Sequence, residues 1–251
     1  MLVDRSSGSP HQEIVVAELA PGGSVDRHLH AFEQALYVLR GELVLEVAGA
    51  VEELGADDFV FVDRGTSHAL RNDGGAPAAW FEVSAPQPGG DLEDTVFVDG
   101  AGPAPAGDSP YGRWHFDGAE LPEPSDSIGL AGFGGGNVGA AVAKVLIGPD
   151  TGASQLNLMV VLYGPGGFIK RHDHAFEEGF FFLDGEIEAE LDGQTHTLRA
   201  GDFCWSGVGS MHALTNRTEQ PVRWLETQVP QPPSRYPARF VGDWERFVAG
   251  G

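Results

Sequence analysis

The stretch RHDHAFEEGFFF at residues 171–182 sets two histidines one residue apart and a glutamate four residues after the second. In a strand, side chains at i and i+2 point to the same side, so His172 and His174 would project together into an interior. Glu178 could enter that interior from the next strand, and His212 could join them from a later turn. Three imidazoles and one carboxylate suit a borderline divalent metal and leave positions open for water or substrate. The sequence therefore predicts a metal centre.

The same pattern occurs twice in the chain. Residues 21–41 align without a gap on residues 165–185, at a constant shift of 144 positions. A constant shift over many residues indicates two copies of one structural unit. The shift also pairs His68 with His212, Asn72 with Asn216, Trp80 with Trp224, and Glu82 with Glu226.

The first copy predicts a second, weaker site built from His28, His30, Gln34 and His68. Gln34 stands where the second copy has its glutamate. Its amide oxygen can coordinate a metal, but it brings no negative charge, so an ion should be held less firmly. A water-filled or substrate-only pocket is the alternative for this copy.

Each copy carries short apolar, partly alternating stretches broken by Gly-containing turns, which is typical of antiparallel strands and hairpins. Short strands at this spacing close into sandwiches or barrels of the jelly-roll kind, so the predicted fold class is all-β. The predicted strand regions are 13–19, 34–49 and 58–63 in the first copy, and 156–163, 179–193 and 202–207 in the second.

The predicted organisation is an N-terminal barrel over residues 1–95, an inter-domain linker over 96–140 and a C-terminal barrel over 141–251. The linker is predicted because 99–112 and 129–139 are rich in Gly, Pro and Ala. A loop that folds over one barrel mouth is the alternative for these residues.

Composition narrows the class of partner. The 251 residues are 41% hydrophobic, which is enough for a sizeable core, and 15 Lys+Arg against 37 Asp+Glu give a formal charge of −22. This charge repels nucleic acid and anionic membranes, so neither is expected as a partner. The single cysteine, Cys204, cannot form an internal disulfide. With no signal-like N-terminus and no long apolar run, a cytoplasmic location is expected.

The spacing resembles the two motifs of the cupin superfamily. These residues are Gly166-x5-His172-x-His174-x3-Glu178-x6-Gly185, followed by Gly201-x5-Gly207-x-Gly209-x2-His212-x3-Asn216, with Gly207 in place of the usual proline. The first copy resembles a cupin with three departures: Gln34 replaces the glutamate, Asp57 a glycine and Asp63 the proline. The resemblance implies a bicupin, two tandem double-stranded β-helix barrels, which can also form homodimers.

In cupins, a site of three histidines and one glutamate resembles that of metal-dependent dioxygenases. The resemblance implies an oxygenase that acts on a small enolic, aromatic or heterocyclic substrate with O2. Fe(II) is the first expectation for the ion, with Mn(II) or Ni(II) as alternatives. Lys170 shares parity with His172 and His174, so it is a candidate catalytic residue for a substrate carboxylate or enolate, or else a rim lysine in solvent. Candidate pocket residues, which could equally be plain core, are Phe180, Phe182 and Trp205.

Other functions stay open at this point. The length and duplicated architecture are similar to the bicupin ureidoglycine aminohydrolases, although only one of the four ligand types matches. A metal-dependent isomerase is a further alternative, because bicupins with a His-His-Gln-His set resemble the first copy. A non-catalytic small-molecule binding protein is the third.

Overall fold

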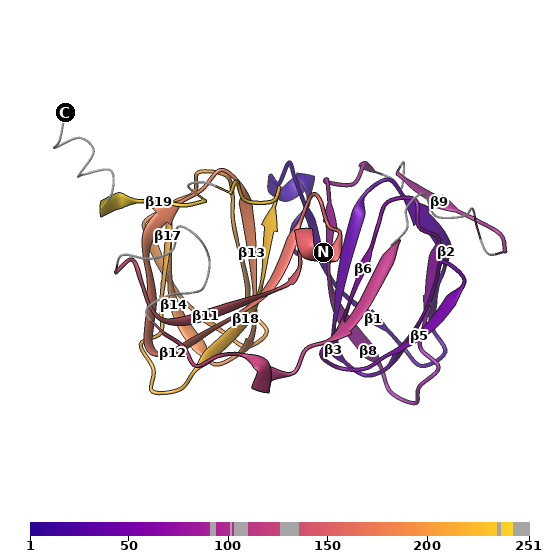
Figure 1. Cartoon of the computed structure of the whole chain (residues 1–251), viewed down its shortest axis with the longest axis horizontal. Helices are drawn as coiled ribbons and strands as arrows, with labels where there is room; N and C mark the ends of the chain where they lie inside the picture. The colour runs from indigo at the N-terminus through magenta and orange to yellow at the C-terminus, as the bar shows by residue number, and fades with distance from the viewer. Residues whose placement is uncertain (91–93, 101, 103–109, 126–135, 235–236, 243–251) are drawn as a thin grey trace. The chain divides into compact units, whose positions relative to one another are not determined.

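The computed structural model describes residues 1–251 apart from 91–93, 101, 103–109, 126–135, 235–236 and 243–251 (Figure 1). The described residues form mainly β-strands, with 3-10 turns at Arg5–Ser7, Gly118–Glu120 and Pro149–Thr151. The predicted all-β class is confirmed. Within the described part of the chain there is no helix with the length and hydrophobicity to cross a membrane.

The chain folds into two compact units. One comprises Met1–Gly118 and Leu146–Leu156 and is called the N-terminal barrel; the other comprises Ala119–Val145 and Asn157–Gly251 and is called the C-terminal barrel. The segment 146–156 belongs to the first unit because the buried carboxylate of Glu33 holds it there. Glu33 Oε1 accepts from Ser154 N at 3.0 Å, and Oε2 accepts from Gln155 N at 2.9 Å.

The N-terminal barrel has two five-stranded antiparallel sheets. The first runs in the order β1 (Glu13–Leu19), β8 (Ala78–Ala85), β3 (Glu33–Arg40), β6 (Asp58–Val62) and β10 (Tyr111–His115). The second runs in the order β5 (Ala50–Leu54), β4 (Leu43–Val47), β7 (His68–Arg71), β2 (Ser24–His30) and β9 (Thr95–Phe97).

The C-terminal barrel repeats this plan with one long strand, β12 (Asn157–Asp173), which takes part in both halves of a nine-stranded sheet. Its first half pairs with β18 (Val222–Val229), and its second half pairs with β17 (His212–Thr215). The chain turns between the halves at Gly166, whose φ of +72° favours glycine. The remaining strands are β11 (Val138–Ile147), β13 (Glu177–Asp184), β14 (Glu186–Leu191), β15 (Gln194–Arg199), β16 (Phe203–Ser206) and β19 (Arg239–Phe240).

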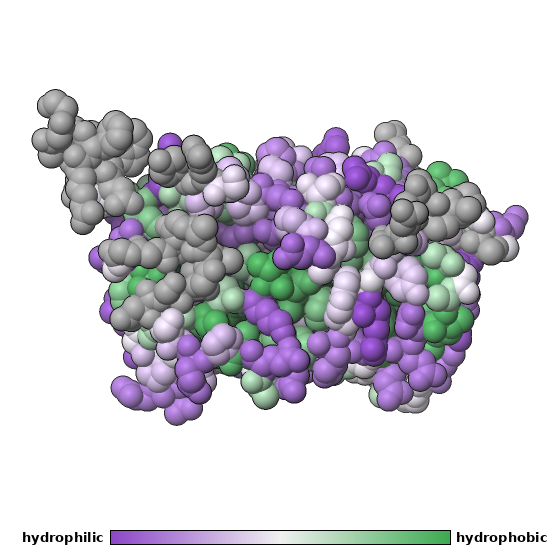
Figure 2. All heavy atoms as spheres, in the orientation of Figure 1, coloured by the Kyte–Doolittle hydropathy of each residue, from purple (hydrophilic) through white to green (hydrophobic). Residues whose placement is uncertain are grey.

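The cores follow the period of two that strands impose. In β4, Leu43, Leu45 and Val47 are buried while the residues between them are partly exposed. Fully burying such a side chain contributes about 1.5–3 kcal/mol, so each barrel has its own source of stability. The face drawn in Figure 2 carries many hydrophilic residues, with hydrophobic residues exposed among them.

Part of the predicted linker is regular structure. Residues 95–97 and 111–115 form strands β9 and β10, which pair with β2 and β6. β10 joins the sheet because Trp114 stacks on Phe59, with ring centroids 5.5 Å apart. Composition misses these strands, since the Gly- and Pro-rich residues around them dominate the average. The glycine-rich residues 129–135 lie outside the described part of the chain.

Candidate metal centre

The structure brings the four predicted ligands of the C-terminal barrel together. His172 ends β12 with His174 just beyond it, Glu178 lies in β13, and His212 opens β17. The three histidines each offer a nitrogen within 4.8 Å of the others. Glu178 Oε2 lies 2.8 Å from His174 Nε2 and 3.2 Å from His212 Nε2. All four side chains are buried, so three imidazoles and one carboxylate face a common centre away from solvent.

The backbone fixes the orientation of each imidazole. In every case Nδ1 lies at hydrogen-bonding distance from a carbonyl oxygen two residues away, and Nε2 is left for the centre. These distances are 2.8 Å from His172 to Lys170, 3.0 Å from His174 to Phe176 and 3.0 Å from His212 to Ser210. Such contacts set the tautomer and the ring direction of metal-ligating histidines, so the site is organised before an ion arrives.

Burial and the carboxylate set the charges at this site. Burial, with a contribution from His212, lowers the pKa of His172 to about 3, so this ring is neutral at pH 7. Burial opposes charge on His174 too, but the Glu178 carboxylate outweighs it and raises the pKa of His174. Burial likewise opposes ionisation of Glu178, and its two histidine neighbours lower its pKa well below the usual range. The centre therefore carries an ionised carboxylate.

These residues fit a divalent metal ion. The Nε2 atoms of His174 and His212 are buried and converge on Glu178 Oε2, at 2.8 Å and 3.2 Å. One cation at this point would bind both nitrogens and the carboxylate oxygen together. Imidazole nitrogens with one carboxylate oxygen are the donors that iron, manganese and nickel accept.

The N-terminal barrel contains the matching set of histidines. His28, His30 and His68 each offer a nitrogen within 4.8 Å of the others, and all three are buried. Their Nδ1 atoms lie 2.7–2.9 Å from carbonyl oxygens two residues away, as in the other barrel. Burial lowers the pKa of all three, to about 4 for His30 and about 3 for His68, so the cluster is neutral.

Gln34 lies beside these histidines with its amide held by a carboxylate. Its Nε2 donates to Glu82 Oε1 at 2.8 Å, and Trp80 Nε1 donates to Glu82 Oε2 at 2.8 Å. Because the amide nitrogen is committed to Glu82, the buried Oε1 is the atom that faces the His30 imidazole. The amide oxygen is thus available as a fourth, uncharged ligand.

The cupin domain family matches residues 15–84 and 159–227, one stretch in each barrel. The chain belongs to the cupin family. It is a two-domain cupin, as its sequence motifs predicted.

Solved structures share this fold. Salicylate 1,2-dioxygenase from Pseudaminobacter salicylatoxidans superposes with a TM-score of 0.68 at 15% identity, covering 88% of this chain and 71% of that chain. AerE from Microcystis aeruginosa superposes with a TM-score of 0.59 at 18% identity, covering 89% and 95%. At these identities the likeness shows the fold alone.

Two curated proteins share sequence with the cupin. Tetracenomycin polyketide synthase protein TcmJ of Streptomyces glaucescens is 38% identical over 109 residues, which is 42% of this chain and 73% of that protein. Polyketide synthase CurC of Streptomyces cyaneus is 28% identical over 92 residues, which is 36% of this chain and 57% of that protein.

A small cavity, called here the inner chamber, adjoins the C-terminal histidines. Its volume is about 20 Å³; it lies among the proposed ligands His172, Glu178 and His212, and Tyr163, Phe180 and Trp224 form part of its walls. Phe180, one of the predicted pocket residues, therefore does line the site. Its neighbour two residues on, Phe182, belongs to the core cluster and packs 5.7 Å from Trp224.

Trp205 does not face the inner chamber. In the register of β13 with β16, Glu178 and Phe180 pair with Ser206 and Cys204, so Ser206 and Cys204 share the inward face. Trp205 pairs with Gly179 on the opposite face. The expectation that Trp205 lines the metal site is corrected, because the alternation along β16 places the even-numbered residues inside.

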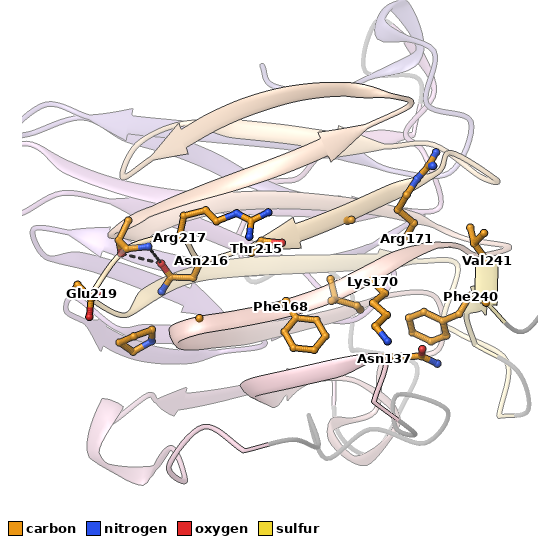
Figure 3. Close-up of a pocket in the computed structure, with 16 residues that line it drawn as sticks. Asn137, Phe168, Lys170, Arg171, Thr215, Asn216, Arg217, Glu219, Phe240 and Val241 are labelled. Carbon is orange, nitrogen blue, oxygen red and sulfur yellow. Dashed lines mark hydrogen bonds between the residues drawn. The ribbon is translucent and has the colours of Figure 1, made fainter.

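Lys170 also lies away from the centre. The pairing of β12 with β17 shifts between Ile169 and His172, which breaks the alternation that predicted an inward Lys170. Its side chain is exposed on the wall of a surface groove of about 940 Å³, beside Asn137 and Phe240 (Figure 3). No catalytic role for this side chain follows from its position; its carbonyl instead orients His172.

A network of polar side chains behind Glu178 escaped the sequence reasoning. Gln228 Nε2 donates to Glu178 Oε1 at 3.0 Å and to Glu226 Oε1 at 3.2 Å, and Trp224 Nε1 donates to Glu226 Oε2 at 3.0 Å. Burial and the neighbouring Glu178 charge raise the pKa of Glu226 well above its usual range. The pairing of Glu82 with Glu226 at the repeat shift is the signal that could have pointed to it.

Phe240 was missed as well. The short strand β19 pairs with the end of β12 and places the Phe240 ring against His172, with centroids 5.1 Å apart. Arg239 Nε holds the same strand by an ion pair to Asp173 Oδ1 at 2.7 Å. In the N-terminal barrel, β9 places Phe97 5.9 Å from His28. The repeat shift misses this correspondence because the two phenylalanines differ by 143 positions.

Proposed function

We propose that this cupin is a metal-dependent oxygenase that acts on a small enolic or phenolic substrate at the C-terminal centre. The observation that carries the proposal is the convergence of three buried imidazoles and one ionised carboxylate at a single point. Four protein ligands leave coordination positions open on an octahedral ion, which a catalytic centre requires.

The ion expected first is Fe(II), with Mn(II) or Ni(II) as alternatives, and His172, His174, Glu178 and His212 would hold it. When bound, such an ion lowers the pKa of a substrate hydroxyl and orients the substrate. The protein supplies the remaining conditions. Its imidazoles are fixed by backbone carbonyls, Glu178 contributes one negative charge, and the apolar rings of Phe180 and Trp224 keep bulk water out.

The comparisons support this class of substrate. The salicylate 1,2-dioxygenase with the same fold has also been seen with gentisate, a hydroxylated aromatic acid. The curated relatives are named as polyketide synthase proteins, and polyketide chains carry β-dicarbonyl groups that enolise and cyclise to phenols. We therefore propose an enolic or phenolic polyketide-type compound as the substrate class.

Oxygen uptake by protein purified without air tests the proposal. Protein loaded separately with Fe(II), Mn(II) or Ni(II) is mixed with a panel of enols, phenols and hydroxylated aromatic acids. We expect one metal form to consume O2 together with one substrate, and His174→Ala to abolish both O2 uptake and metal retention in the C-terminal barrel. Loaded protein that consumes no O2 with any compound, or an equally active His174→Ala variant, would rule the oxygenase out.

A second candidate is a metal-dependent isomerase or cyclase that moves protons without O2. The similarity to two polyketide synthase proteins favours it, since ring closure of a polyketide needs no oxidant. The same substrate panel under strict anaerobiosis separates the two. Conversion at an unchanged rate without O2 would select this candidate over the oxygenase.

We also propose a weaker metal site in the N-terminal barrel, held by His28, His30, His68 and the Gln34 oxygen. The three converging imidazoles and the buried Gln34 Oε1 beside His30 support it. Metal analysis of wild-type protein beside His174→Ala and His30→Ala variants tests it. We expect each variant to lose only the ion of its own barrel; an unchanged metal content in His30→Ala would contradict the second site.

A further inference from the structure

The hydroxyl of Tyr163 is a buried polar group that the proposed metal centre does not use. Tyr163 lies in the first half of β12, is 1% exposed, and packs its ring edge-on against Trp224, with centroids 4.8 Å apart. Its side chain forms part of the wall of the inner chamber. No described residue forms a hydrogen bond with the Tyr163 hydroxyl, although the tyrosine as a whole is buried.

The surroundings make this hydroxyl a hydrogen-bond donor. Burial, followed by the charges of Glu226 and Glu178, raises the pKa of Tyr163 well above its usual range, so the phenol keeps its proton. Both carboxyl groups are near enough to act on it electrostatically, yet neither accepts its hydrogen. Glu226 and Glu178 are occupied by Trp224 and Gln228 instead. A hydrogen-bond acceptor bound between the Tyr163 hydroxyl and the metal ligands would give this hydroxyl the partner that it lacks.

The inner chamber limits the size of that acceptor. Its volume of about 20 Å³ exceeds the roughly 10–15 Å³ that one water needs by this kind of measure, but it is far too small for an aromatic ring. Apolar side chains, including Ile169 and Leu214, make up much of the remaining wall. Because His172, Glu178 and His212 also line this space, a bound ion would take up part of it, and a ligand of one or two heavy atoms is the largest that would fit between the ion and Tyr163.

The N-terminal barrel shows that the fold does not need this hydroxyl. At the repeat shift, Leu19 replaces Tyr163, Leu36 replaces Phe180 and Ser84 replaces Gln228. A leucine thus fills the same place in the barrel that has no glutamate ligand. At this position, the tyrosine hydroxyl thus occurs only in the barrel that has the Glu178 carboxylate. This pattern is expected of a group that contacts a ligand bound at that centre.

We propose that the inner chamber binds a small oxygen ligand, dioxygen or water, and that the Tyr163 hydroxyl donates the hydrogen bond that holds it. This inference rests on the proposed metal centre and adds to it a residue that touches the small ligand. It predicts that the small ligand contacts Tyr163, whereas a larger organic ligand of the ion does not depend on this hydroxyl.

Nitric oxide, a diatomic stand-in for dioxygen, tests the inference on Fe(II)-loaded full-length protein under anaerobic conditions. Binding is followed by absorbance and by the electron paramagnetic resonance signal of the iron–NO adduct. We expect Tyr163→Phe to keep its iron and to bind NO about tenfold more weakly, as the loss of one buried hydrogen bond implies. Tyr163→Leu, which copies the N-terminal barrel, should behave in the same way.

Tyr37→Phe is the matched control. It removes the same atom from a buried tyrosine of the N-terminal barrel, whose hydroxyl donates to Asp57 Oδ1 at 2.6 Å. Its NO affinity should equal that of the wild type. In a second arm, 4-nitrocatechol reports an organic ligand of the iron, and its affinity should change less than threefold in Tyr163→Phe.

A third arm distinguishes dioxygen from water. Water-proton relaxation in Mn(II)-loaded protein reports water at the centre, and a change in Tyr163→Phe without a change in NO affinity would assign the chamber to water. Weaker NO binding alone would assign it to the diatomic ligand. No change in either arm, or an equal loss of 4-nitrocatechol and NO affinity, would overturn the inference while leaving the proposed function standing. Wild-type protein that takes up no metal would overturn both.

Discussion

The two barrels hold three histidines in the same way and differ in what stands beside them. In both, each Nδ1 faces a carbonyl oxygen two residues away, and the three rings point to one centre. In the C-terminal barrel a carboxylate, Glu178, touches the histidines directly. In the N-terminal barrel an amide, Gln34, takes that place and the carboxylate of Glu82 lies one step behind it.

The difference amounts to an exchange of amide and carboxyl positions. The C-terminal barrel also has its amide, Gln228, but places it between Glu178 and Glu226. The barrel scaffold thus fixes the histidine geometry, while two or three polar side chains decide the charge at the centre. The same fold thus carries a negatively charged centre in one barrel and an uncharged one in the other.

The largest expected effect comes from removing the C-terminal charge. Glu178→Gln keeps the shape but copies the fourth ligand of the N-terminal barrel, so we expect the dissociation constant of the C-terminal metal to rise at least about a hundredfold, or about 2.7 kcal/mol. Titration calorimetry against a competing chelator measures it. Glu226→Gln is the control, because that carboxyl is held neutral and lies behind the ligands. Equal losses in the two variants would contradict the assigned roles.

In metal-free protein, acid should destabilise the N-terminal barrel more than the C-terminal barrel. The folded-state pKa values of His30 and His68, about 4 and about 3, lie below the unfolded value of about 6.5. Between these limits the unfolded chain binds more protons, so stability falls as the pH drops. At pH 5 each of these histidines lowers the free energy of unfolding by about 2 kcal/mol relative to pH 7.

The C-terminal barrel is partly protected from this loss. His172 contributes the same loss there, but Glu178 raises the pKa of His174, and that group gains stability as the pH falls. Hydrogen exchange of chelator-treated protein at pH 7 and pH 5, corrected for intrinsic exchange rates, resolves the two barrels. Equal loss of protection in both would refute the difference.

A smaller gain is expected from converting the N-terminal centre. Gln34→Glu alone sets a second carboxyl against Glu82, so one of the two must stay protonated and metal affinity should rise only about threefold. Adding Ser84→Gln restores the intervening amide seen in the other barrel, and the double variant should bind metal about tenfold more tightly than wild type. Chelator competition in a His174→Ala background isolates this site. A double variant no better than Gln34→Glu would show that the amide is irrelevant.

The sequence was sufficient for the fold and for the four residues that meet in each barrel. Strand alternation predicted which residues form the cores. The repeat matched His28, His30, Gln34 and His68 with the corresponding residues of the C-terminal barrel. These succeed because period-two patterning and motif spacing are local properties of the chain. The order of the strands in each sheet, by contrast, depends on pairings between distant segments.

The failures have specific physical causes. Lys170 was predicted to point inward because no residue type indicates the register shift between Ile169 and His172. Trp205 was predicted to point inward because the sequence does not show which face of β16 lies inside the barrel. Tyr163 and Phe240 reach the centre from strands far from the motifs, so only tertiary pairing reveals them. Glu226 was visible in the repeat, but its role depends on contacts with Gln228 and Trp224.

The phenylalanine beside the first histidine of each barrel sets how quickly an ion can be removed. Phe240 is 2% exposed and shields His172, whereas Phe97 is 57% exposed and leaves His28 at 9%. We expect a chelating agent to reach an ion of the proposed N-terminal site first, because Phe240 and strand β19 cover His172 more fully than Phe97 covers His28. The ions of the two proposed sites would then leave in sequence, which gives a practical route to protein carrying metal in the C-terminal barrel alone.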